Sequence, residues 1–335
     1  MANRERKTKT PKEPENELVR ALEFVKMAQI DKPGEQPLKT HCRIANGFVV
    51  AFDGVLAAGY PIADDLVACP HTYRLLDALK RCKSALSVTK LGLGQIAIKS
   101  GNFRAEIPCL NPSLLPNTVP DNNAGVISDV IKDGFKHLNP IVSGSGGTTI
   151  ESSILLQNNS MIATDRHILI EYWHGINLPE GMSVPKVAIQ AISTARAKLV
   201  GFGYSGRTAT FYYDNGAWIR TQLYSEPWPD VGRVINAGDP AAAIPVPPAL
   251  FDAVTAVLPF GASSAVRLSS AGLTASSPDS GDATYEMSGL PELHISGKYL
   301  LAIKDIATKI DLTGNGNVTY FYGDNVRGAI TQMGQ

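Results

Sequence analysis

The chain has 335 residues, of which 44% are hydrophobic and 19% are charged, and its 31 basic side chains balance 31 acidic ones. This composition is typical of a soluble globular protein, and the net charge alone does not indicate a nucleic-acid partner. No apolar run reaches the roughly 18 to 20 residues that a membrane helix needs, which excludes an ordinary membrane-spanning chain. A chain of this length exceeds the size at which one core keeps growing, so we expect two or three domains.

The N-terminal segment, residues 1–16, reads MANRERKTKTPKEPEN and contains five basic residues, two prolines and almost no apolar side chain. Such a segment cannot bury enough surface to order itself, so we expect a disordered basic tail. It is either a solvated tail or a basic arm that touches an acidic partner. Because it lacks the apolar core of a signal peptide, we expect a cytoplasmic protein with no membrane partner.

The first third of the chain alternates predicted helices with predicted strands. Apolar residues at helical spacing predict helices over residues 17–29 and 69–86, with a strand pair between them. The segments 95–101 and 103–110 predict two further strands. Residues 111–125 contain three prolines and are typical of a linker.

The same order of elements returns twice. Residues 126–138 and 184–200 predict helices, residues 151–173 predict strands, and residues 207–224 predict a hairpin that turns at Asn215-Gly216. A second Pro/Ala/Gly-rich linker covers residues 237–248. Beyond it, residues 249–258 and 296–310 predict helices, and residues 264–277 and 317–325 predict strands.

A short repeat supports duplicated units. The stretch MIATDRHILIEY, residues 161–172, and the stretch VVAFDGVLAAGY, residues 49–60, lie about 110 positions apart. Each places an Asp, Asp165 or Asp53, between two apolar runs, as in two strands joined by a tight turn. We expect both carboxylates to close their turns by accepting backbone N–H groups, rather than to form a catalytic pair.

These elements predict an α+β fold of three similar domains, each with two helices packed on antiparallel sheets. A doubly wound parallel sheet does not fit, because the strands are mostly sequential and joined by hairpins. The predicted boundaries are residues 17–120, 121–236 and 237–335.

Positive charge is concentrated on the predicted helices, although the whole chain is neutral. Either these side chains are simply good solvent-facing helix formers, or they create a field with a direction. The residues are Arg20, Lys26, Arg74, Lys80, Arg81, Lys83, Lys132, Lys136, Lys186, Arg196, Lys198, Lys298, Lys304 and Lys309.

No motif in the sequence indicates an enzyme, a cofactor or a metal ion. Neither GxSxG nor HExxH occurs, and the six histidines do not fall at metal-ligand spacings. The four cysteines, at positions 42, 69, 82 and 109, form no CxxC pair, so we expect buried thiols. An enzyme with an unrecognised site remains the alternative from another functional class.

Four short segments resemble the bacterial sliding clamp, the beta subunit of DNA polymerase III. They are ATDRHIL (163–169), PWPDVGRVI (227–235), AVRLSSAGLTAS (265–276) and ISGKYLLAI (295–303). The resemblance covers about residues 17–333 in family order. It implies a homodimer closed head to tail around duplex DNA, which tethers a DNA polymerase and is placed by a clamp loader. The basic side chains would then face phosphates; a clamp-like scaffold that does not encircle DNA is the second alternative.

The resemblance also implies an apolar pocket for short peptides of partner proteins. Its wall would consist of Thr164, His167, Leu169, Pro229, Arg233, Val234, Ser296, Tyr299, Val326 and Met333. Three features depart from the family pattern: Arg166 stands in place of Gly, Ile168 in place of Arg, and AITQMGQ in place of the usual ending. We therefore expect a groove whose preferred peptide differs.

The subunit contact implied by the resemblance would involve Ala105 and Ile107 on one side and Val257 and Leu258 on the other. Ala105 stands where the family favours a bulky aromatic side chain. Pro108 can lie only on an edge strand or at a bulge, because proline has no N–H group to donate.

Overall fold

The computed structural model describes residues 16–334 except residues 33, 65, 92–93, 145 and 314–316. The predicted tail therefore lies outside the described residues, apart from Asn16, whose side chain accepts the backbone N–H of Leu18 at 2.9 Å and caps the first helix. The chain divides into two compact units. Unit 1 consists of residues 1–125, 197–205 and 209–221, and unit 2 consists of residues 126–196, 206–208 and 222–335.

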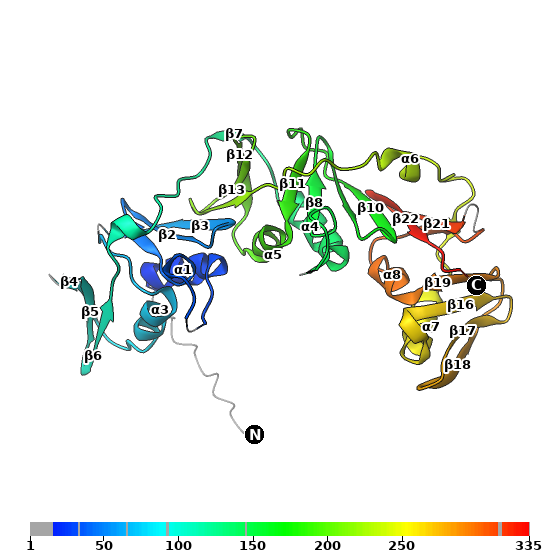
Figure 1. The fold of residues 1–335 in the computed structure, drawn as a ribbon, viewed down its shortest axis with the longest axis horizontal. Coiled ribbons are helices and arrows are strands. Elements are labelled where there is room, and N and C mark those ends of the chain that lie inside the picture. Colours follow the sequence, from blue (N-terminus) through cyan, green and yellow to red (C-terminus); the bar gives the residue numbers. More distant parts are fainter. Residues whose placement is uncertain are drawn as a thin grey trace, which may run out of the picture. The chain divides into compact units, whose positions relative to one another are not determined.

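The described part of unit 1 combines three α-helices with two antiparallel sheets; Figure 1 shows α1 and α3 beside the strands β2 and β3. The helices are α1 (Glu17–Val25), α2 (Pro37–Thr40) and α3 (Thr72–Lys80). The seven-stranded sheet has the order β1 (Arg43–Ala45), β2 (Phe48–Phe52), β3 (Leu56–Pro61), β14 (Trp218–Gln222), β13 (Thr208–Tyr213), β12 (Leu199–Tyr204) and β7 (Asn123–Gly125). The three-stranded sheet has the order β4 (Leu86–Leu91), β5 (Gln95–Ser100) and β6 (Phe103–Pro108).

Unit 2 contains five α-helices among its described residues, and two further antiparallel sheets. The helices are α4 (Val130–Leu138), α5 (Lys186–Thr194), α6 (Gly232–Ile235), α7 (Leu250–Val257) and α8 (Gly297–Ala302). The eight-stranded sheet has the order β11 (Met182–Pro185), β8 (Ser153–Leu156), β9 (Ser160–Thr164), β10 (Ile168–Trp173), β22 (Val326–Thr331), β21 (Val318–Tyr322), β20 (Lys309–Asp311) and β15 (Ile244–Pro245). The four-stranded sheet has the order β18 (Gly281–Glu286), β17 (Gly272–Ser277), β16 (Ala265–Ser269) and β19 (Leu293–Ser296).

Helices pack in pairs: α1 with α3, α4 with α5, and α7 with α8. Each helix buries one apolar stripe against a sheet or its partner helix; α1, for example, buries Leu18, Leu22 and Val25. The six longer helices lie where the sequence predicts them. The predicted helix 296–310 is too long, because α8 ends at Ala302 and residues 309–311 form β20.

The antiparallel α+β class predicted from the sequence is confirmed. The two large sheets, however, each join strands from different predicted domains. In unit 1, β14 pairs with β3, and Trp218 lies opposite Gly59. In unit 2, β10 pairs with β22, and Leu169 lies opposite Ala329. The three-domain boundaries stay a prediction, and no described helix has both the length and the apolar composition to cross a membrane.

Candidate functional site

The repeated Asp turns are built alike. In the first copy, Asp53 Oδ1 accepts the backbone N–H groups of Val55 and Leu56 at 2.8 and 2.7 Å. In the second, Asp165 Oδ1 accepts those of His167 and Ile168, both at 3.1 Å. The same two positions donate in both copies, so the predicted structural role of the carboxylates is confirmed. The second turn joins β9 to β10 and presents His167 to solvent.

Leu169 lies at the centre of a three-strand surface in unit 2. It is the second residue of β10, and it lies opposite Thr164 of β9 on one side and Ala329 of β22 on the other. The end of β22 is fixed to the turn, because the Thr331 N–H donates to the His167 carbonyl at 2.8 Å. This surface is therefore held by the sheet itself.

The segment 228–235 crosses the same surface. Trp228 Nε1 donates to Ser183 Oγ at 2.8 Å, which fixes the start of the segment. Trp228 and Val231 pack on a buried cluster that includes Leu169 and Ile235. The other members of that cluster are Leu155 and Ile162. The segment ends in α6, a short helix that the sequence did not predict. The segment and this helix form one wall of a hollow.

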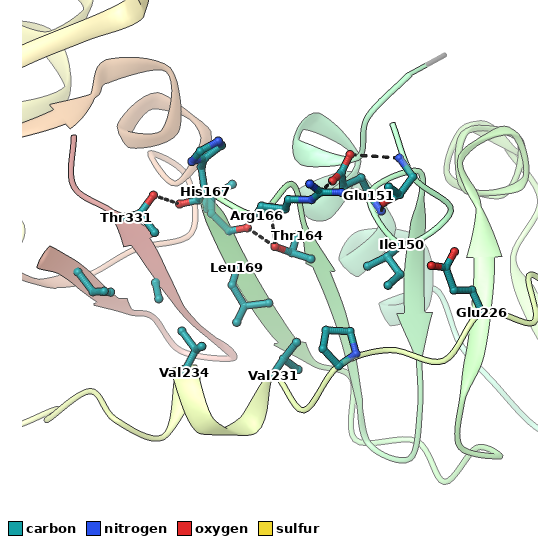
Figure 2. Close-up of a pocket in the computed structure, with 15 residues that line it drawn as sticks. Ile150, Glu151, Thr164, Arg166, His167, Leu169, Glu226, Val231, Val234 and Thr331 are labelled. Carbon is teal, nitrogen blue, oxygen red and sulfur yellow. Dashed lines mark hydrogen bonds and ion pairs between the residues drawn. The ribbon is translucent and has the colours of Figure 1, made fainter. Parts of the chain in front are cut away.

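That hollow, the first hollow, has a volume of about 410 Å³ and lies between the sheet surface and the segment (Figure 2). Leu169 faces Val231 and Val234, with His167 and Thr331 at one end and Ile150 and Glu226 at the other. Five predicted residues line it: Thr164, His167, Leu169, Pro229 and Val234. The residues that the sequence analysis missed are Thr148, Ile150, Glu151, Arg166, Ile168, Glu226, Val231, Val318, Ala329 and Thr331.

A second hollow of about 630 Å³ adjoins the first and shares His167 and Thr331 with it. Besides His167, three further predicted residues line this second hollow: Ser296, Tyr299 and Met333. The rings of His167 and Tyr299 stack with their centroids 6.3 Å apart. Burial, together with a hydrogen bond and the charge of Asp165, raises the pKa of Tyr299. The phenol therefore stays protonated and donates to the carboxylate that closes the turn.

Two predicted pocket residues line neither hollow. Val326 is only 2% exposed and belongs to the core of the β10–β22 pairing, where it lies opposite Tyr172. Arg233 is exposed and forms an ion pair with Asp230 one turn earlier, at 3.7 Å. Arg233 is next to the lining residue Val234, and Val326 lies three positions before the lining residue Ala329, but their side chains leave the helix or strand in other directions.

Arg166 forms part of the rim of the first hollow. Its φ of +76° is unusual for a residue with a Cβ, and the corresponding residue of the first copy is Gly54, with φ +107°. Its side chain is 69% exposed, and its Nε is paired with Glu151 Oε1. Oε2 of the same carboxylate accepts the Thr148 N–H at 3.2 Å. The departure from glycine noted in the sequence thus places an ion pair at the rim (Figure 2).

Most of the predicted phosphate-facing side chains are exposed, but several lie outside helices. The exposed ones are Arg20, Arg74, Lys80, Arg81, Lys83, Lys136, Arg196, Lys198, Lys298, Lys304 and Lys309. Lys83, Arg196, Lys198 and Lys304 follow helix ends, and Lys309 belongs to β20. Lys26 and Lys186 are half-buried.

The expectation that Lys132 is exposed is wrong. Its side chain is 7% exposed and forms an ion pair with Asp129 at 2.9 Å. Lys132 Nζ also donates to the carbonyl of Ala195, the residue that caps the C-terminus of α5, at 3.2 Å. A cation at this position satisfies a terminal helix carbonyl and suits the negative end of the helix dipole. Lys132 therefore joins α4 to α5.

The four residues expected at a subunit contact differ in exposure. Val257, at the end of α7, is only 1% exposed and Ile107 on β6 is buried, so both belong to the core of their own unit. Leu258 and Ala105 are half-buried and present some apolar surface. Strand β6 pairs with β5 alone in its sheet, so Pro108 lies on an edge strand as expected.

The described histidines with lowered pKa values lie outside both hollows. They are His41, His71 and His174, and burial lowers the pKa of each. The described residues contain no group of three or more His, Cys, Asp or Glu residues that could hold a metal ion. Burial also raises the pKa of the Cys42 thiol to about 12, which leaves it unreactive.

No family model and no curated protein sequence matches the chain. Solved structures do. The DNA polymerase sliding clamp from Pseudomonas aeruginosa, solved with a ligand, has a TM-score of 0.80 at 14% identity, over 95% of this chain and 97% of its own. Caulobacter crescentus pol III beta also has a TM-score of 0.80, at 17% identity over 95% and 98% of the two chains.

The Helicobacter pylori beta clamp, solved with a DNA ligase peptide bound, has a TM-score of 0.77 at 16% identity, over 95% of this chain and 98% of its own. At sequence identities this low, the TM-scores establish the fold alone. The shared fold covers nearly the whole of both chains in each comparison. The chain therefore has the fold of the bacterial DNA polymerase III beta subunit, the sliding clamp.

Proposed function

We propose that the chain is a DNA sliding clamp, a non-enzymatic processivity factor of the cytoplasm that closes around duplex DNA and tethers a DNA polymerase. The observation that carries the proposal is a pair of adjoining hollows on a chain with the sliding-clamp fold along 95% of its length. A topological link keeps the polymerase near its template at high effective concentration, without strong DNA contacts.

The two hollows suit a short linear peptide of the polymerase, the clamp loader or another partner. The first hollow has an apolar floor at Leu169, Val231 and Val234 and a few polar groups at its rim. Such a site gives affinity through buried apolar anchors and modest specificity through polar contacts. The DNA ligase peptide on the Helicobacter pylori clamp is a partner of this kind.

Contact with DNA would be independent of sequence. The exposed Lys and Arg side chains on and beside the helices can attract phosphates, which carry no base identity. A protein that slides needs contacts of this kind, because bidentate contacts to base edges would hold it at one site. A clamp loader would place the ring on the duplex.

Ring closure requires a second copy of the chain. Among the described residues, strand β6 pairs only with β5 in its sheet and leaves one row of backbone N–H and C=O groups at the sheet edge. Pairing this edge across a head-to-tail subunit contact would remove a site of aggregation. Ala105 and Leu258 are the half-buried residues that we assign to this contact, with the buried Ile107 and Val257 supporting them from the core.

Light scattering across a dilution series tests the ring. A dimer has twice the 35.8 kDa mass of the chain, about 72 kDa, and we expect this mass at high concentration. A monomer at every concentration would contradict closure by two copies and would favour the clamp-like scaffold that does not encircle DNA.

A further inference from the structure

The exposed face of the α1–α3 pair carries an acid between two bases. Glu23 of α1 contacts Lys26 one turn later through Oε2, and it contacts Lys80, in the last turn of α3, through Oε1. All three side chains are partly exposed, so the cluster is open to solvent. One carboxylate therefore holds two ammonium groups that come from different helices.

Helix stability alone does not account for this arrangement. An acid three residues before a lysine stabilises a helix by only about 0.2 to 0.5 kcal/mol, and one lysine is enough for that effect. Glu23 holds a second lysine from α3. Related pairs occur on the other two helix pairs, where Asp133 contacts Lys136 at 3.3 Å and Asp252 contacts Lys304 at 3.8 Å.

The cluster has a fixed charge at neutral pH. Partial burial of Glu23 acts to raise the pKa of its carboxyl, but the hydrogen bonds and charges of Lys26 and Lys80 outweigh it and lower that pKa. Glu23 is therefore ionised when DNA is present, and the cluster of Glu23, Lys26 and Lys80 carries one net positive charge.

We propose that Glu23 competes with DNA phosphates for Lys26 and Lys80, and so weakens the grip of the α1–α3 face on duplex DNA. The inference rests on the proposed function. A phosphate that approaches either lysine must share its ammonium group with the carboxylate or displace the carboxylate, so each contact is weakened and breaks readily. A protein that moves along DNA benefits from attraction that is distributed and weak.

The test is equilibrium binding of the full chain to a fluorescent duplex, measured by anisotropy at several salt concentrations. The variant Glu23→Gln keeps the shape of the side chain and removes its charge. The control is Asp77→Asn, which makes the same charge change at an exposed position on α3 for which the described residues provide no ion pair.

We expect Glu23→Gln to bind more tightly than the parent and to steepen the plot of log K against log salt by about 0.9, the slope of one added phosphate contact. Between about 50 and 200 mM salt, its affinity should then fall roughly threefold more than that of the parent. Asp77→Asn should change the slope by much less. The double variant Glu23→Gln/Lys80→Gln should return the slope toward the parent value.

Two outcomes overturn the role of Glu23. Equal effects of Glu23→Gln and Asp77→Asn would mean that only net charge matters, and a shallower slope in Glu23→Gln would mean that Glu23 positions the lysines for phosphate. A parent chain with no salt-dependent binding to the duplex would instead contradict the proposed DNA contact. Thermal unfolding of each variant confirms that folded protein is compared.

Discussion

Arg166 has a backbone conformation that the first copy of the turn gives to glycine. A side chain with a Cβ costs roughly 1 to 2 kcal/mol in this left-handed region. Arg166→Gly and Arg166→Ala both remove the ion pair with Glu151, but only the glycine relieves the strain. We therefore expect the Gly variant to be more stable than the Ala variant by about 1 kcal/mol in urea unfolding.

The matched control is Gly54→Ala in the first copy, where φ is +107°. It should destabilise the protein by roughly 1 to 2 kcal/mol, because no contact is lost and only strain is added. An Arg166→Ala variant as stable as Arg166→Gly would show that the turn relaxes, and that the arginine is not strained.

Val234 tests the first hollow without disturbing the core. Leu169 is unsuitable, because it belongs to a buried cluster, whereas Val234 is 44% exposed and lines the hollow. Val234→Asp should weaken binding of a fluorescent DNA ligase peptide of the kind bound by the Helicobacter pylori clamp at least tenfold, since a charge would be desolvated against apolar ligand atoms. The control Val126→Asp, at another exposed valine outside the hollow, should leave peptide affinity unchanged.

His174 makes stability depend on pH. Its Nδ1 accepts the Ile176 N–H and its Nε2 donates to the Ser160 carbonyl, both at 3.1 Å, so the buried ring is neutral. Burial lowers the pKa of His174 below its ordinary value of 6.5. The unfolded chain then binds more protons than the folded chain at acidic pH. The contribution of the neutral His174 ring to folding stability is therefore present above pH 6.5 and is lost as the pH falls through the pKa of His174 in the folded chain.

We expect the urea midpoint of the parent to fall between pH 7.5 and 5.5, and to fall less in His174→Asn. Each unit by which the folded pKa is depressed corresponds to about 1.4 kcal/mol. The depressed pKa values of His41 and His71 act in the same direction, so some pH dependence should remain. Identical pH profiles for parent and variant would show that His174 is protonated without cost.

The segment 228–235 has one side-chain hydrogen bond at its start besides its apolar packing. The Trp228 Nε1 to Ser183 Oγ bond can be measured by a double-mutant cycle with Trp228→Phe and Ser183→Ala. We expect a coupling energy of about 0.5 to 1.5 kcal/mol, and a weaker affinity of the first hollow for the ligase peptide in each single variant. Additive effects on stability would mean that apolar packing alone holds the segment.

The helices could be predicted because their signal is local. The apolar stripe of α1 is visible in a short window, and the Asp165 turn could be predicted from its neighbours and its copy at Asp53. Helix α6 has only four residues and too few turns to show a period. Lys132 looks solvent-facing in sequence, and only the approach of α5 to α4 reveals that it is buried.

The site was predictable in part for the same reason. Thr164, His167 and Leu169 share one motif with a recognisable turn, and Pro229 and Val234 share another. Val318 and Ala329 reach the first hollow only because β21 and β22 pair beside β10, more than a hundred positions away in the chain. Pairing over such a distance leaves no local trace in one sequence.

Encirclement of DNA is a property of the whole ring, and release of the protein when the DNA is cut tests it. The protein is diluted to separate its subunits, concentrated again with a closed circular plasmid, and passed through a gel-filtration column at high salt, which screens phosphate contacts. After loading and before the column, the plasmid in half of the sample is cut once by a restriction enzyme. We expect the protein to stay with the circular DNA and to leave the linear DNA through its ends. Equal retention on both forms would contradict encirclement.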